Sequence, residues 1–141
     1  MMFHAKVKKI RRGYQIQFVE LPNIVTYCDR KDDVLETAHD ALIGCIEADI
    51  DQFLDIPIPR LIKVRNTIAV SIPLNLTCAI LFRRLRKEQG LTTMEVAQKL
   101  GISRQAYERL ESSRSNPSTD TIEKVLRILG ISDIEIKTLA A

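Results

Sequence analysis

The second half of the chain alternates short amphipathic segments with turn residues, which is typical of a small helical bundle. Gly90, Gly101 and Gly130 each stand where a left-handed residue would end a helix. Ser103 and the Asn116-Pro117-Ser118 stretch each stand where a side chain would cap the next helix. The pattern predicts four helices, over residues 77–89, 93–100, from 104 past 110, and 119–129.

The second and third of these helices have the sequence features of a helix-turn-helix. Thr92 and Glu95 have the spacing of a capping box, and only three or four residues separate the second helix from the third. Two short helices joined so briefly meet at a steep angle, and the small Ala97 and Ala106 would let them cross closely. The basic side chains of the first helix are expected to stay outside the bundle: Arg83, Arg84, Arg86 and Lys87.

The first half reads as a small sheet covered by a helix. Alternating residues predict strands over 3–9, 14–19, 24–28 and 68–72, the first two forming a hairpin at Gly13 and the last ended by Pro73. Pro57 and Pro59 mark a connector, because proline cannot continue a helix. One apolar stripe predicts a helix that covers this sheet, with Asp32 or Asp33 as its N-cap. The residues of the stripe are Leu35, Ala38, Leu42, Ile46, Ile50 and Phe53. The fold class is therefore α+β, with domains expected at 1–73 and 76–141.

Composition narrows the class of protein further. The chain is 45% hydrophobic and 28% charged, as ordinary globular proteins are, and it has no apolar run long enough for a membrane span. The N-terminus lacks the order of a signal peptide, so we expect a cytoplasmic protein. Cys28, Cys45 and Cys78 are widely spaced and read as core thiols rather than metal ligands, and no motif predicts a cofactor.

Charge is distributed unevenly along the chain. Residues 29–55 hold nine acidic residues against two basic ones, a net charge of −7, whereas residues 82–114 hold eight basic against four acidic, a net charge of +4. One surface should therefore repel phosphate while another attracts it. The four aspartates that we select as a partner-binding set are Asp32, Asp33, Asp40 and Asp49.

Two resemblances bear on these features. The run from Leu91 to Glu111, with Asn116-Pro117, resembles the Cro/repressor or Xre-like helix-turn-helix family over about 55 residues, with Thr93 and Ser113 departing from its usual glutamine and glycine. More faintly, the run from Gly13 to Pro22 and Ala38-His39-Asp40-Ala41-Leu42 resemble HicB antitoxins, although Asn23 and Cys28 stand where glycines are usual. That family joins a partial ribonuclease-H-like sheet and helix to a DNA-binding domain.

The resemblances imply a DNA-binding antitoxin that represses its own operon. By position and by family resemblance, Arg104, Gln105 and Arg109 would read base edges, since arginine can hold guanine and glutamine can hold adenine bidentately. The residues expected to contact phosphate are Thr93, Lys99, Ser103 and Arg114. The first half would bind a small basic HicA-type toxin that cleaves mRNA, and the acidic segment would complement it. The alternative for each basic side chain is a solvated surface position.

The sequence leaves alternative functions open. A ribonuclease-H-like sheet can host carboxylates that hold metal ions, but Glu20 and Asp29 are the only acids near strand ends and are expected to be structural. A stand-alone DNA-binding regulator whose first half senses a ligand or partner is the main alternative function. We expect a homodimer or higher homo-oligomer that reads two half-sites roughly 34 Å apart. The tail over 131–139 either contributes to that assembly or caps its own bundle.

Overall fold

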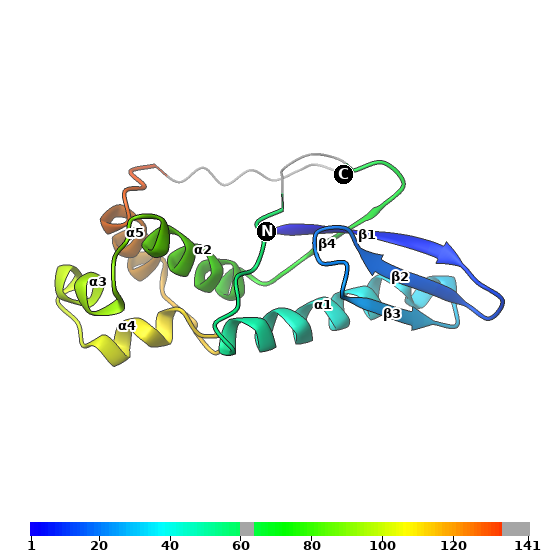
Figure 1. Ribbon diagram of the computed structural model, residues 1–141, viewed down its shortest axis with the longest axis horizontal. Coiled ribbons are helices and arrows are strands. Elements are labelled where there is room, and N and C mark those ends of the chain that lie inside the picture. Colours follow the sequence, from blue (N-terminus) through cyan, green and yellow to red (C-terminus); the bar gives the residue numbers. More distant parts are fainter. Residues whose placement is uncertain (60–63, 134–141) are drawn as a thin grey trace. The chain divides into compact units, whose positions relative to one another are not determined.

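The computed structural model describes residues 1–59 and 64–133, which include both predicted parts of the chain. They form two compact units, Met1–Thr77 and the part that begins at Cys78. The first unit holds a sheet and a long helix, and the second is helical, so the predicted α+β class is confirmed (Figure 1). The tail over 131–139, for which assembly and capping of its own bundle were both left open, lies largely outside the described residues.

The sheet of the first unit has four antiparallel strands in the order β3-β2-β1-β4. Their bounds are Met2–Lys9 for β1, Tyr14–Phe18 for β2, Val25–Cys28 for β3 and Ile68–Ser71 for β4, each within one residue of the predicted strand ends. Gly13 turns the chain between β1 and β2 with φ +82°, and a Cβ built there would lie 2.1 Å from the Cys28 carbonyl oxygen. Only glycine therefore fits this turn.

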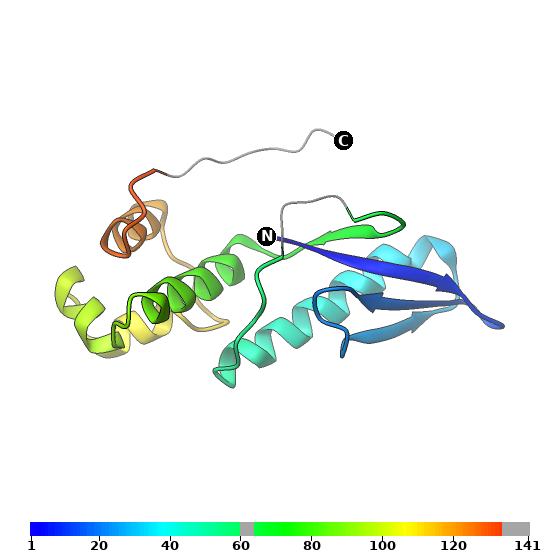
Figure 2. The same cartoon turned by 45° about the horizontal axis from the view of Figure 1, so that its top comes forward.

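One long helix, α1 (Val34–Asp51), covers a face of this sheet after a short 3-10 turn, η1 (Lys31–Asp33) (Figures 1 and 2). The sheet contributes Phe3, Ala5, Ile16, Phe18 and Val70 to the buried core. The helix contributes residues spaced by four: Val34, Ala38, Leu42, Ile46 and Ile50. Complete burial of a side chain the size of isoleucine or phenylalanine contributes about 1.5–3 kcal/mol, so contact between the helix and the sheet stabilises the unit.

The first and last residues of the predicted apolar stripe of α1 lie outside the core. Leu35 and Phe53 were expected on the buried stripe, but they are 58% and 75% exposed. Leu35 instead lies at an open hollow of about 460 Å³ beside β4, together with Asp32, Glu36 and His39. Asp33 occupies the N-cap position, but its backbone is already helical and its side chain makes no capping hydrogen bond, since η1 runs directly into α1.

The second unit contains α2 (Leu74–Glu88, which starts in the first unit), α3 (Thr93–Leu100), α4 (Arg104–Leu110) and α5 (Thr119–Ile128). All four helices were predicted, and Gly90, Gly101 and Gly130 have the expected positive φ. The first helix begins three residues earlier than predicted. Thr77 was taken as its start, but the Thr77 amide and hydroxyl both donate to the Pro73 carbonyl from within the helix.

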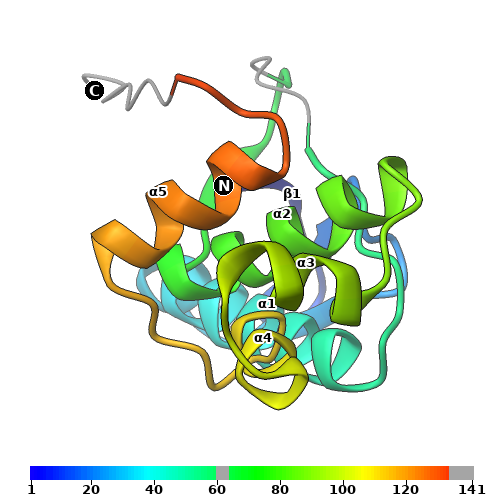
Figure 3. The same ribbon diagram turned by 90° about the vertical axis from the view of Figure 1, so that its left-hand side faces the viewer.

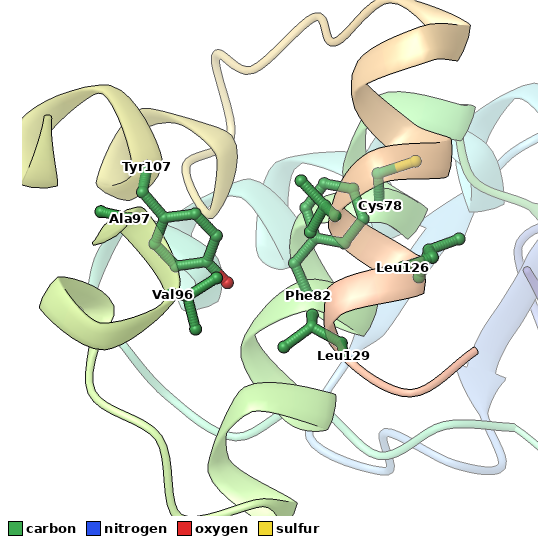
Figure 4. Packing of buried hydrophobic residues seen from close by; sticks show 8 residues of the cluster. Cys78, Phe82, Val96, Ala97, Tyr107, Leu126 and Leu129 are labelled. Carbon is green, nitrogen blue, oxygen red and sulfur yellow. The ribbon is translucent and has the colours of Figure 1, made fainter. Parts of the chain in front are cut away.

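Apolar side chains from all four helices meet in one core. Phe82 of α2 lies against Leu126 and Leu129 at the end of α5, while Tyr107 of α4 lies over Val96 and Ala97 of α3 (Figure 4). Cys78 is also buried, and burial raises the pKa of its thiol, so it is an inert core thiol as predicted. Cys28 and Cys45 are only half-buried, so their prediction as core residues was wrong.

Three further side chains of this unit were misplaced by the sequence analysis. Arg83 is buried and Arg86 is nearly so, although both were expected to face solvent. Ala106 is exposed, so only Ala97 lies in the contact between α3 and α4.

The described ranges contain neither a membrane-spanning helix nor a metal-binding cluster. No helix there is long and apolar enough to cross a membrane. No three His, Cys, Asp or Glu side chains in residues 1–59 and 64–133 gather closely enough to hold a metal ion.

Candidate nucleic-acid interface

Reciprocal hydrogen bonds fix the start of α3. The Thr92 hydroxyl accepts from the Glu95 amide at 3.2 Å, and the Glu95 carboxylate accepts from the Thr92 amide at 2.7 Å and the Thr92 hydroxyl at 2.9 Å. These bonds hold the pKa of Glu95 below its usual range, chiefly through the Thr92 amide. The predicted capping box is therefore confirmed, and it sets the direction in which α3 leaves its loop.

A short turn then reverses the chain into α4. Gly101 ends α3 in the left-handed region at φ 69°, and Ser103 caps α4 by accepting from the Ala106 amide at 3.1 Å. The two helices pack against each other next to α2 and α5 (Figure 3). Tyr107 anchors α4 in the core with a fully buried ring. This is the predicted helix-turn-helix.

The opposite side of α4 carries the residues predicted to read bases. Arg104, Gln105 and Arg109 are all exposed. At about 100° per residue, Gln105 and Arg109 lie roughly opposite Tyr107, and Arg104 lies at the flank of the same surface. A cation and an amide on a projecting helix can bind guanine and adenine edges in the major groove.

The residues predicted to contact phosphate flank α4 in the sequence, three before it and one after it. Lys99, Ser103 and Arg114 are exposed, and Thr93 is half-buried at the start of α3. Ser103 already uses its hydroxyl as the cap of α4, which leaves the O–H of that group able to donate. These positions suit phosphate oxygens, which accept hydrogen bonds but carry no sequence information.

Glu108 links two of the predicted contact residues. Its Oε1 atom accepts from Arg104 Nε at 2.7 Å and from the Thr93 hydroxyl at 3.2 Å. The bond from Arg104 is the main reason that the pKa of Glu108 lies below its usual range. The arginine is therefore held along the helix in the free protein.

A buried charge cluster fixes the base of α4 to α2. Glu111 accepts from Arg86 Nε at 2.6 Å and from Arg86 Nη2 at 2.8 Å, while Arg86 Nη1 donates to the Leu91 carbonyl. The hydrogen bond to Glu111 raises the pKa of Arg86. Arg83 donates to the Glu111 backbone carbonyl at 2.9 Å. Burial is the main cause that raises the pKa of neighbouring Tyr107 beyond its usual range.

A second charged surface lies on α1. Glu36, Asp40, Glu47 and Asp51 are exposed, and their spacing places them within about 60° of one another around the helix. We call this set the acidic stripe. Of the four aspartates selected from the sequence, Asp40 belongs to it, and Asp32 and Asp33 lie just before the helix. Asp49 lies roughly opposite Asp40, toward the sheet side, so the structure does not bring the four together.

The carboxylate that could have suggested an enzyme has a structural environment. Glu20 accepts from the His4 amide at 2.9 Å, and its other oxygen lies 2.6 Å from His4 Nδ1. Asp29 is exposed at the end of β3. Glu20 thus ties the segment after β2 to the beginning of β1.

Each of the two units matches a family of known proteins. A family model described as "HicB_like antitoxin of bacterial toxin-antitoxin system" matches residues 2–80, which is more than half of the chain. The chain belongs to this HicB-like antitoxin family. A second family model, described as a helix-turn-helix domain, matches residues 79–139. The HicB-like antitoxin therefore carries a DNA-binding domain of the helix-turn-helix class.

Curated relatives agree with both matches. The chain is 29% identical to Antitoxin HicB 1 of Photorhabdus laumondii over 84% of this chain and 74% of that protein. It is 23% identical to Antitoxin HicB of Escherichia coli K12 over 84% of this chain and 85% of that protein. An uncharacterised HTH-type transcriptional regulator of Sinorhizobium fredii is 42% identical over 40% of this chain and 74% of that protein.

Sequence reasoning missed several residues of this HicB-like antitoxin's two surfaces. Glu108 was not selected, although its position four residues after Arg104 is a recognisable ion-pair spacing. Glu36, Glu47 and Asp51 were not selected either, although steps of four and seven residues place them on the same helix face as Asp40. Glu111 had no local signal, because its partner Arg86 is 25 residues away.

Proposed function

We propose that this antitoxin acts in the cytoplasm, where it neutralises a small, basic, mRNA-cleaving toxin of the HicA type. In the same proposal it represses its own operon by binding operator DNA. The first unit binds the toxin, and α4 of the second unit reads the operator. Two activities on one chain would couple the supply of antitoxin to the amount of toxin present.

The observation that carries the DNA-binding part is the surface of α4. Arg104, Gln105 and Arg109 are exposed on a helix that Ser103 caps and Tyr107 anchors in the core. Each good bidentate contact between such a side chain and its base is worth about 1–3 kcal/mol of discrimination. Lys99 and Arg114 add cations for phosphate contacts.

The acidic stripe supports the toxin-binding part. The stripe places four carboxylates along one side of α1, among them Glu36 and Asp40 one helical turn apart. Like charges at that spacing destabilise a helix by about 0.2–0.5 kcal/mol. A surface with this concentration of negative charge gains when a cationic partner covers it, and a toxin built to hold RNA is cationic.

Autorepression requires an assembly larger than one chain. A single helix-turn-helix domain contacts few base pairs, whereas a dimer can read two half-sites roughly 34 Å apart. We therefore propose that the antitoxin binds its operator as a homodimer or a higher homo-oligomer, and that the operator contains a repeated half-site.

The test of operator reading is Arg104→Ala. Fluorescence anisotropy titrations would compare a duplex from the promoter region of the antitoxin's own operon with a scrambled duplex of the same length, at one salt concentration. We expect about 10- to 100-fold weaker binding to the promoter duplex and a loss of threefold or less on the scrambled one.

Lys124→Ala is the matched control, because Lys124 is an exposed cation of α5 that pairs with Asp120. It should change both affinities little. If Arg104→Ala weakens binding equally to both duplexes, Arg104 contributes only charge and the base-reading role is wrong.

A further inference from the structure

Glu108 is a carboxylate within a surface whose other members are cations and amides. It stands one helical turn after Arg104, and helix geometry places it between Arg104 and Arg109 on the exposed side of α4. Its side chain is 41% exposed. A negative charge there would oppose binding to phosphate, so its presence on a DNA-reading helix needs a physical reason.

One oxygen of Glu108 joins the first residues of both helices. Thr93 opens α3, Arg104 opens α4, and both donate to Glu108 Oε1, at 3.2 Å and 2.7 Å. The Arg104 side chain remains 56% exposed while it is held in this way. The pair therefore restrains the arginine without covering it.

The geometry of the contact leaves the arginine able to read a base. A guanidinium carries five N–H groups, and Glu108 accepts from the one on Nε. The four N–H groups of the two terminal nitrogens can still make an end-on bidentate contact with guanine O6 and N7. An arginine that is already oriented loses less conformational entropy when it binds.

We propose that Glu108 is a positioning residue that orients Arg104 for base reading and disfavours its use as a phosphate contact. The inference rests on the proposed role of Arg104 at the operator. On operator DNA the Arg104–Glu108 pair stays intact. On random DNA, turning Arg104 to a phosphate would break its ion pair with Glu108 and leave that carboxylate with the Thr93 hydroxyl alone beside the negative backbone. Glu108 thus raises specificity for the operator by weakening the complex with random DNA.

The test is Glu108→Gln, which removes the charge and keeps the size of the side chain. Titrations with the promoter duplex and the scrambled duplex at several salt concentrations should show roughly three- to tenfold tighter binding to scrambled DNA. The plot of log affinity against log salt for scrambled DNA should become steeper by about one unit. The ratio of the two affinities should fall.

Glu123→Gln is the matched control. Glu123 accepts from Arg127 Nη2 at 2.8 Å in a pair of the same spacing on α5, and its loss changes the net charge equally. If Glu108→Gln and Glu123→Gln change the affinity ratio and the salt slope equally, the effect is one of net charge and the inference is overturned.

A double-mutant cycle separates positioning from direct contact. In an Arg104→Ala background, Glu108→Gln should no longer lower the affinity ratio. If it still does, Glu108 touches the DNA itself and is not a positioning residue. If Arg104→Ala alone weakens both duplexes equally, the proposed base reading fails, and the inference fails with it.

A second variant keeps the charge but shortens its reach. Glu108→Asp should leave binding to scrambled DNA weak, because the negative charge remains, while promoter binding falls, because the contact with Arg104 is lost. Promoter binding equal to that of the unmodified protein would contradict the orienting role.

Discussion

The carboxylate of Glu111 shows how one buried side chain can hold a recognition helix in place. It is 5% exposed and receives two hydrogen bonds from Arg86, whose side chain is 13% exposed. Removing one partner of a buried pair leaves the other charge unsolvated, which typically costs about 3–5 kcal/mol. We expect Glu111→Gln to lower the unfolding free energy of the helical unit by about 3 kcal/mol, measured by urea denaturation with circular dichroism.

Glu123→Gln gives the comparison for that measurement. Glu123 and Arg127 are 60% and 70% exposed, so losing their pair should cost less than about 1 kcal/mol. If both variants lose the same stability, Glu111 acts as a solvated surface charge and the cluster does not hold α4.

The burial of Arg83 and Arg86 could not be predicted from their own neighbourhood. Both stand among basic residues in a helix whose apolar stripe is complete without them, and such residues usually face solvent. Their burial depends on Glu111, which only the folded chain brings close. The exposed positions of Arg104, Gln105 and Arg109 were predictable, because Tyr107 and Leu110 fix the buried side of α4.

Helix caps of the second unit give a prediction with a distinctive pH dependence. The depressed pKa of Glu95 means that its contribution to stability is present above its unfolded pKa and is lost as the pH falls through the lower folded value. We expect Thr92→Ala to cost about 1 kcal/mol near neutral pH and less below about pH 4. Thermal unfolding at several pH values measures this difference.

Ser118→Ala is the control, because Ser118 caps α5 by accepting from the Thr121 amide at 3.2 Å without a reciprocal carboxylate. Its cost should stay nearly constant over the same pH range. A loss in Thr92→Ala that also stays constant would mean that the Glu95 carboxylate adds nothing to the cap.

Helices and strands were predictable where local chemistry decides them. Glycine ends and serine or threonine caps located α3, α4 and α5, and period-two alternation located the strands. The start of α1 was predictable in position, because Asp33 is its N-cap, but not in detail, since the Asp33 side chain makes no capping hydrogen bond. The start of α2 was displaced by three residues, because Thr77 lies inside the helix and donates to the Pro73 carbonyl.

The chain as a whole combines two surfaces of opposite charge on two compact units. The excess of acid in residues 29–55 was visible in the sequence, but the sequence analysis selected Asp49, which lies away from the acidic stripe. Helical geometry, rather than the count of charges, decides which acids can meet one partner. Toxin binding and operator binding should therefore be separable by substitutions in different units.

A triple variant that should impair toxin binding but not operator binding neutralises three members of the acidic stripe: Glu36→Gln, Asp40→Asn and Glu47→Gln. Electrostatic attraction mainly accelerates association, so the rate constant with the toxin of the same operon should fall about tenfold at low salt and less at high salt. Promoter affinity should remain within about threefold, whereas Arg104→Ala should show the reverse pattern. A control that neutralises Asp29, Asp120 and Glu123, which are exposed acids on other elements, removes equal charge away from the stripe. If it slows association as much, net charge rather than the stripe attracts the toxin.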